Sequence, residues 1–208
     1  MALLSAQGGP ERLLTAPGET NMVPLDWSRD GRLLLGNCGY GEMGRLGTCV
    51  LSLPNIGENG RVRVITRAPE YNLFCQRFSP NQQWISFLAL GAEDTALSKI
   101  YVVPTAGGGW VAMTDGPWYV DKPRWAADGR TLYYITDRDG FLNVWGRRFD
   151  PAAGKPVGEP FRLTAFGSEQ RAIPARFGQL EMAVTSNHVL LPVQEKSGNI
   201  WLLDHIDK

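Results

Sequence analysis

The sequence shows no excess of charge of either sign, with 21 Lys and Arg residues against 21 Asp and Glu residues. Proteins that bind nucleic acid through its phosphates usually carry a basic excess, so we expect no nucleic-acid partner. No apolar run reaches the roughly 18 residues that a membrane-spanning helix needs, so we expect no membrane insertion. Residues 1–6 lack the charged start and the long apolar core of a signal peptide. The compartment therefore stays open between periplasm and cytoplasm.

The residues that build catalytic and metal sites are also scarce. The chain has three Cys and two His, and it lacks the Cys and His spacings of a zinc site. It has no G-x-S-x-G nucleophile turn and no Walker-type phosphate loop. His188 lies in a predicted turn and His205 lies close to the C-terminal end, so surface positions are expected for both. We expect no catalytic residues, no metal and no cofactor.

Two of the three cysteines, Cys38 and Cys49, flank the glycine-rich stretch 39–47 and can face each other across a hairpin. That position is compatible with the Cα separation of about 4.4–6.8 Å that a disulfide needs. Cys75 is then left over, which weakens an interpretation as a disulfide framework. Two separate buried thiols are the favoured expectation, and a Cys38–Cys49 bridge is the alternative.

Turn-forming residues, in contrast, are abundant, with 24 Gly and 14 Pro. A short strand that ends in Thr recurs about every 50 residues, and a loop and an aromatic residue that opens a hairpin follow it. Asp-Gly pairs in these hairpins favour tight turns. The shared place of the aromatics predicts that they pack in the core between repeats. The Thr residues are Thr15, Thr66, Thr114 and Thr164, and the aromatics are Trp27, Phe78 and Trp125, with Val184 as the fourth counterpart.

Four such units of four strands predict an all-β chain, folded as a single β-propeller domain over residues 1–208. Propellers pack four-stranded antiparallel blades around a central channel. The strand 12–15 has no blade and the last unit has no fourth strand, so we expect this N-terminal strand to complete the last blade and close a ring of about four blades. A ring made by two chains and a piece of a longer propeller are the alternatives. The blade repeats are expected at 26–66, 77–114, 124–164 and 181–204, the last completed by 12–15.

The hairpin motif itself is specific. Residues 27–32 read W-S-R-D-G-R, residues 78–81 read F-S-P-N and residues 125–130 read W-A-A-D-G-R. These stretches resemble the repeat of the TolB-type β-propellers, relatives of the WD-type repeat. Residues 198–204, G-N-I-W-L-L-D, resemble the closing blade of propellers found behind bacterial serine/threonine kinase domains. The resemblance implies the fold and says little about activity; the chain departs from the family in having about four blades where six are usual.

One stretch is similar to the start of a calcium-binding loop, because Asp137 and Asp139 precede Gly140. Such a loop needs a Glu at position 12, and Arg148 stands there. Asp followed by Gly is also the ordinary composition of a tight turn. We therefore interpret this stretch as a turn without a metal.

The residues beside the repeat aromatics differ between copies: Asp26, Arg77 and Arg124 precede them, and Glu181 lies close to the fourth counterpart. Because side chains alternate along a strand, these residues are expected to point away from the buried aromatics and into the channel. Two arginines with carboxylates there can recognise a carboxylate, a phosphate or a peptide terminus. The alternative is a structural network in which the charges neutralise one another.

Two loops are candidates for contacts with a partner, because exposed aromatics and extra loop length on a regular scaffold often serve binding. Trp118 and Tyr119 lie in the loop that enters the third unit, where a cap over the blade edge is the alternative. The connection 166–179 is longer than its counterparts, and a plug over the channel mouth is the alternative for it. Its candidate residues are Arg171, Arg176 and Phe177.

These patterns predict a non-catalytic propeller that binds a protein or peptide, as an accessory or sensor domain of a larger bacterial protein. A metal-dependent hydrolase or lyase with its site in the channel is one alternative. The detached propeller of a prolyl-oligopeptidase-like or kinase protein is another. A homodimer is compatible with each of these functions.

Overall fold

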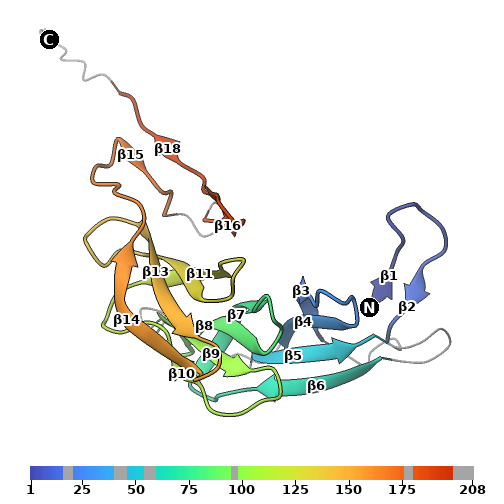
Figure 1. Ribbon diagram of the computed structural model, residues 1–208. Coiled ribbons are helices and arrows are strands. Elements are labelled where there is room, and N and C mark those ends of the chain that lie inside the picture. Colours follow the sequence, from blue (N-terminus) through green and yellow to red (C-terminus); the bar gives the residue numbers. More distant parts are fainter. Residues whose placement is uncertain (16–20, 40–45, 54–59, 95–97, 176–179, 199–208) are drawn as a thin grey trace, which may run out of the picture.

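The computed structural model describes residues 1–15, 21–39, 46–53, 60–94, 98–175 and 180–198. Over these residues the chain is all-β and contains no helix that could cross a membrane. Three four-stranded antiparallel sheets follow one another along the chain as blades 1, 2 and 3 (Figure 1). Blade 1 comprises β3 (Val23–Trp27), β4 (Leu33–Cys38), β5 (Gly47–Ser52) and β6 (Arg61–Thr66); blade 2 comprises β7 (Tyr71–Phe78), β8 (Trp84–Gly91), β9 (Ser98–Pro104) and β10 (Val111–Ala112); blade 3 comprises β11 (Val120–Trp125), β12 (Thr131–Thr136), β13 (Asn143–Asp150) and β14 (Lys155–Arg162).

The first hairpin of blade 1 and that of blade 3 turn where the Asp-Gly pairs predict. The Gly31 N–H donates to the Ser28 carbonyl at 2.9 Å, and the Gly129 N–H donates to the Ala126 carbonyl at 2.9 Å. The two glycines have φ of 71° and 67°, a conformation that side chains with a Cβ rarely adopt. These glycines are therefore explained by the turn geometry.

Apolar side chains fill the space between successive blades. Leu35 of blade 1 packs with Phe78 and Ile85 of blade 2, and Val102 of blade 2 packs with Trp125 of blade 3. Phe78 and Trp125 are each 8% exposed. The core position predicted for these two aromatics is confirmed, and each of them faces the preceding blade.

The same prediction is wrong for Trp27, which is 43% exposed. In the described residues before blade 1, the secondary structure is a hairpin of β1 (Ala2–Leu3) and β2 (Arg12–Leu13). That hairpin packs Leu3 against Leu34 and Leu51 and leaves Trp27 uncovered. The burial of a repeat position is thus decided by the neighbouring unit, which the repeat motif does not encode.

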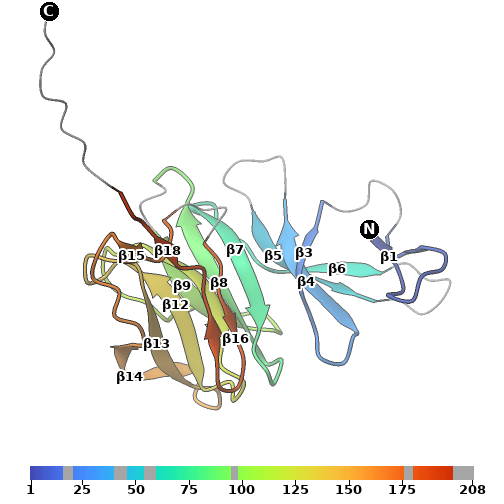
Figure 2. The ribbon, with the colours of Figure 1, turned by 90° about the horizontal axis from the view of Figure 1, so that it is seen from above.

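The two ends of the chain do not form a shared blade within the described residues. β2 pairs with β1, with Leu13 opposite Ala2, so the N-terminal strand folds back on its own hairpin. The fourth unit consists of two short pairs, and its predicted third strand, 199–203, lies outside the described residues. The result is an open arc whose ends lie apart in both views (Figures 1 and 2). The pairs of the fourth unit are β15 (Arg171–Ala172) with β18 (Gln194–Glu195), and β16 (Ala183–Val184) with β17 (Val189–Leu190).

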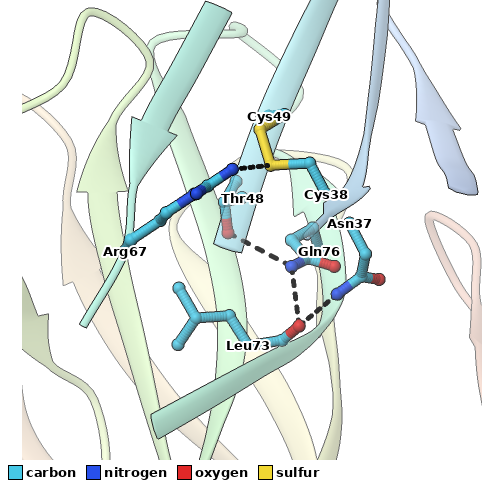
Figure 3. The surroundings of a disulfide bond; sticks show 7 residues. All are labelled: Asn37, Cys38, Thr48, Cys49, Arg67, Leu73 and Gln76. Atoms are coloured by element: carbon cyan, nitrogen blue, oxygen red, sulfur yellow. Dashed lines mark hydrogen bonds between the residues drawn. A yellow bond between two sulfur atoms is a disulfide. The ribbon is translucent and has the colours of Figure 1, made fainter. Parts of the chain in front are cut away.

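Cys38 and Cys49 form a disulfide with Cα atoms 5.9 Å apart, which corrects the expectation of two separate thiols (Figure 3). Antiparallel pairing of β4 with β5 places Cys38 opposite Gly47 and Gly36 opposite Cys49. The two cysteines are therefore diagonal neighbours on one face of blade 1. Their spacing in the sequence does not reveal this register, because the register depends on the geometry of the connecting turn.

Candidate binding site

The first strands β3, β7, β11 and the short β16 lie side by side along the inner side of the arc (Figure 1). Each of the three blade strands carries a register shift, which marks a bulge. Bulges re-aim side chains and frequently occur beside functional sites. The bulges of β7 and β11 hold Cys75 and Lys122 at φ of 56° and 52°.

The residues predicted to point into the channel, here called the channel ring, are Asp26, Arg77, Arg124 and Glu181. The two arginines of this channel ring connect neighbouring units. Arg77 Nη1 donates to the Leu25 carbonyl of blade 1 at 2.8 Å. Arg124 Nε donates to the Met182 carbonyl of the fourth unit at 2.8 Å. Burial, followed by the nearby Arg124 charge, lowers the pKa of Arg77. Both guanidinium groups thus bind backbone across a blade boundary.

The two carboxylates of the ring also make contacts between neighbouring units, Asp26 with backbone and Glu181 with a side chain. Asp26 Oδ2 accepts a hydrogen bond of 2.8 Å from the Phe78 N–H. Glu181 forms an ion pair with Arg124 and accepts from the Met182 N–H at 2.9 Å. Although burial opposes it, the Met182 N–H and the Arg124 guanidinium hold the pKa of Glu181 below its ordinary value. These contacts favour the structural network, and a ligand role for the ring stays a prediction.

A buried polar cluster next to this ring was missed by the sequence analysis. Asp121 is 1% exposed, and its Oδ2 lies 4.0 Å from Lys122 Nζ and accepts from the Tyr119 hydroxyl at 3.0 Å. The Cys75 thiol donates to Asp121 Oδ1 at 3.6 Å. Burial and then the Asp121 charge raise the pKa of Cys75 to about 11 and raise the pKa of Tyr119 as well. The sequence did contain a signal for this cluster, because two charged residues, Asp121 and Lys122, follow each other inside the strand β11.

A cavity of about 530 Å³ opens where the turn between β12 and β13 meets the fourth unit. Pockets that hold small ligands or single side chains of partners commonly measure 300–1,000 Å³. Tyr119 lines the cavity, and its hydroxyl donates to the buried Asp121. The apolar lining is Phe141, Leu142, Ala172, Ile173, Pro174 and Ala175, and the polar lining includes Asp137, Glu169, Gln194 and Lys196.

The structure brings together parts of the two predicted contact loops, since Tyr119 and residues 172–175 line the same cavity. Trp118 does not line it; this side chain is 39% exposed and lies over Gly116. Arg171 pairs across β15 and β18 with Glu195 at 3.5 Å, at the surface. The other two candidates of this loop, Arg176 and Phe177, lie outside the described residues.

The carboxylates of the calcium-like stretch serve the turn and its neighbours. Asp137 Oδ1 accepts from the Tyr119 N–H at 3.0 Å, and Asp139 Oδ2 pairs with Arg162 at 2.6 Å. Gly140 has a φ of 89°, as a tight turn requires. In the part of the chain that the structure describes, no three His, Cys, Asp or Glu side chains gather in a way that could hold a metal ion.

Comparison with known sequences gives a short match. No family model matches the chain. The "Uncharacterized peptidase YuxL" of Bacillus subtilis is 44% identical over 48 residues, which cover 23% of this chain and 7% of that protein. A match of this length carries no activity over to this chain.

Comparison with solved structures extends over most of the chain. TolB from Acinetobacter baumannii aligns with a TM-score of 0.62 at 18% identity and covers 93% of this chain and 45% of its own. A TolB structure from Agrobacterium tumefaciens gives 0.59 at 21% identity, with 79% and 55% covered.

A puromycin-hydrolysing peptidase of Mycobacterium tuberculosis gives a TM-score of 0.61 at 14% identity, with 84% of this chain and 28% of the peptidase covered. The chain thus spans about half the length of the two TolB chains and less of the peptidase. At these identities the likeness concerns the fold alone. The blades, their sequential order and these alignments identify the fold as that of the TolB-like β-propellers.

Proposed function

We propose that this chain is a non-catalytic binding module that holds a peptide segment of a partner protein in the cavity beside Tyr119. The observation that carries the proposal is the cavity itself, which combines an apolar lining with charged groups at its edge. Most of its lining comes from turns and loops beside blade 3, and loops on a regular scaffold are where binding residues usually lie.

The lining suits a peptide. Phe141, Leu142 and Ile173 offer an apolar surface for one bulky side chain. Asp137, Glu169 and Lys196 provide charges of both signs beside it. A small anion would need a basic site and a metal would need several oxygen ligands, whereas a peptide presents apolar, charged and amide groups together.

The titratable groups near the cavity support a binding role over a catalytic one. A nucleophile must be deprotonated or activated by a neighbouring base. The pKa of the Cys75 thiol is about 11, and burial and Asp121 raise the pKa of the Tyr119 phenol, so both groups are protonated at neutral pH. No His lines the cavity in the described part of the chain.

We further propose the role of an accessory or sensor domain in a larger bacterial protein, and one of the structural comparisons supports it. The peptidase from Mycobacterium tuberculosis contains a region of this fold within a chain more than three times the matched length. We therefore propose that this chain supplies recognition, while any chemistry is carried out by another domain or protein.

The test begins with an array of immobilised peptides in which one bulky apolar residue is flanked by charged residues. The best-retained peptide is labelled and titrated against the protein by fluorescence anisotropy. The Phe141→Ala variant removes an aromatic ring from the cavity lining and is expected to weaken binding at least about tenfold. The matched control Phe161→Ala removes a ring from β14, away from the cavity, and is expected to bind like the wild type.

If the Phe141→Ala variant binds the peptide as tightly as the wild type does, the peptide does not bind in this cavity. Retention of no peptide above background by the wild-type protein would contradict a peptide-binding function. Thermal unfolding of both variants confirms that the comparison is made between folded proteins.

A further inference from the structure

We infer that the peptide bound in the cavity carries a Lys or Arg beside its bulky apolar residue, and that Asp137 recognises this cation. The inference rests on the proposed function and deepens it, because it names the sign of the charge that the cavity selects. It is carried by the charged residues of the cavity lining and by the partners that each of them has.

The charged residues of the lining do not balance. They are the carboxylates of Asp137 and Glu169 and the ammonium group of Lys196. Two negative charges against one positive charge leave the lining with a net charge of one negative. A peptide with a positive charge at this place neutralises the lining, whereas a peptide with a negative charge adds to the imbalance.

On the side of the fourth unit, the charges already compensate each other. Lys196 Nζ lies 3.9 Å from Glu169 Oε2. The Lys196 N–H also donates to the Gln170 carbonyl at 2.9 Å, which holds the segments of the two charged residues together. This side of the cavity therefore offers no net charge to a ligand.

On the side of blade 3, Asp137 has no such compensation. Its Oδ1 accepts a hydrogen bond of 3.0 Å from the Tyr119 N–H. Within the described ranges of the chain, no Lys or Arg forms an ion pair with it. The side chain is exposed, so a bound peptide can reach the carboxylate.

The cation next to Asp137 in the sequence is held elsewhere. Arg138 pairs with Asp115 at 3.6 Å, and its guanidinium lies over the ring of Trp145, 5.2 Å from the ring centre. Both contacts keep its charge on the side of blade 2. The unbalanced charge of the lining is therefore that of Asp137.

The shape of the site suits a Lys or Arg side chain. Asp137 and Phe141 lie at the two ends of one turn, which the Gly140 N–H closes by donating to the Asp137 carbonyl at 2.8 Å. A carboxylate thus lies next to an apolar surface. Lys and Arg combine an apolar stem with a charged end, and the cavity of about 530 Å³ can hold such a stem beside one bulky apolar side chain.

Matched peptides with both ends capped test the sign of the charge. Each peptide has one central Phe and carries Lys, Gln or Glu at one neighbouring position, so that only the charge differs between counterparts. In anisotropy titrations, we expect the best Lys peptide to bind about three- to fivefold more tightly than its Gln counterpart, as an exposed ion pair allows, and the Glu counterpart to bind most weakly. Added salt is expected to reduce this preference, because exposed charges are screened.

A single substitution tests the assignment to Asp137. Asp137→Asn removes the charge and keeps an oxygen that can accept from the Tyr119 N–H, so it is expected to bind the Lys and Gln peptides equally. The matched control Asp139→Asn removes a carboxylate of the same turn that lies outside the cavity lining and pairs with Arg162. It is expected to keep the full preference. Thermal unfolding confirms that both variants are folded.

The outcomes separate this inference from the proposed function. Equal binding of the Lys and Gln peptides by the wild type would overturn the inference, as would a preference that survives in Asp137→Asn. In both cases the proposed function still stands if Phe141→Ala weakens the binding of every peptide. Binding of no peptide by the wild type would overturn both.

Discussion

Blades 1 and 3 are copies of one repeat, yet they are stabilised in different ways. Blade 3 lies between blade 2 and the fourth unit, and side chains on both of its faces, such as Leu132 and Ile135, are fully buried. Blade 1 packs against blade 2 on one face and against a two-stranded hairpin on the other, and it carries the disulfide. In a repeat protein, the stability that a residue contributes depends on the neighbouring repeats. Blades 1 and 3 show that dependence within one chain.

The largest effect is expected when the repeat tryptophan of blade 3, Trp125, is truncated, and the matched truncation in blade 1 is that of Trp27. Trp125→Ala removes a side chain buried between blades and is expected to lower the free energy of unfolding by about 3–5 kcal/mol. Trp27→Ala is expected to lower it by less than about 1 kcal/mol, because the ring is already 43% exposed. Urea unfolding of the two variants and the wild type measures both losses. Equal losses would show that the two blades are not packed differently.

The next effect concerns the disulfide of blade 1. The double variant Cys38→Ser, Cys49→Ser frees a loop with a sequence separation of 11 residues. The entropy of closing such a loop predicts a loss of about 3 kcal/mol in the free energy of unfolding. A thiol reductant is expected to destabilise the wild type by the same amount and to leave the double variant unchanged. A wild type that resists the reductant in unfolding experiments would contradict this role.

The smallest effect concerns the ion pair that links blade 3 to the fourth unit. The Glu181 side chain is 62% exposed, so its pair with Arg124 is expected to contribute no more than about 1 kcal/mol. The pKa of Glu181 is lowered in the folded chain, so this contribution is present above the ordinary value of 4.5 and is lost as the pH falls through the lowered value.

Thermal unfolding of the wild type and of Glu181→Gln across this pH range measures the contribution. The two proteins are expected to differ at pH 7 and to converge in acid. A difference that grows as the pH falls would contradict the sign of the shift.

Much of the fold was available from the sequence. Asp30-Gly31 and Asp128-Gly129 mark their turns, and the aromatics before them place the strands of each blade. These signals are local, because a tight turn and an alternating strand are determined by residues that are close in sequence. The repeat predicted four units, and the first three of them form four-stranded sheets in the predicted order.

The sequence did not predict features that depend on the register or on the neighbouring unit. The Cys38–Cys49 pairing depends on the register of β4 and β5, and the exposure of Trp27 depends on what precedes blade 1. The sequence predicted no cavity, although it singled out Tyr119 and the long connection, parts of which line it, as candidate contact loops. Phe141 and Leu142 were missed because only the folded chain brings their turn beside residues 172–175.

Filling the cavity tests the central claim most directly. Ala175 lies in its lining and is exposed, so Ala175→Trp occupies the space without removing a core contact. The matched control Ala153→Trp adds the same ring to an exposed turn after β13. In anisotropy titrations with the array-selected peptide, we expect Ala175→Trp to weaken binding at least about tenfold and Ala153→Trp to bind like the wild type. Undiminished binding by a folded Ala175→Trp variant would contradict the assignment of the cavity as the peptide site.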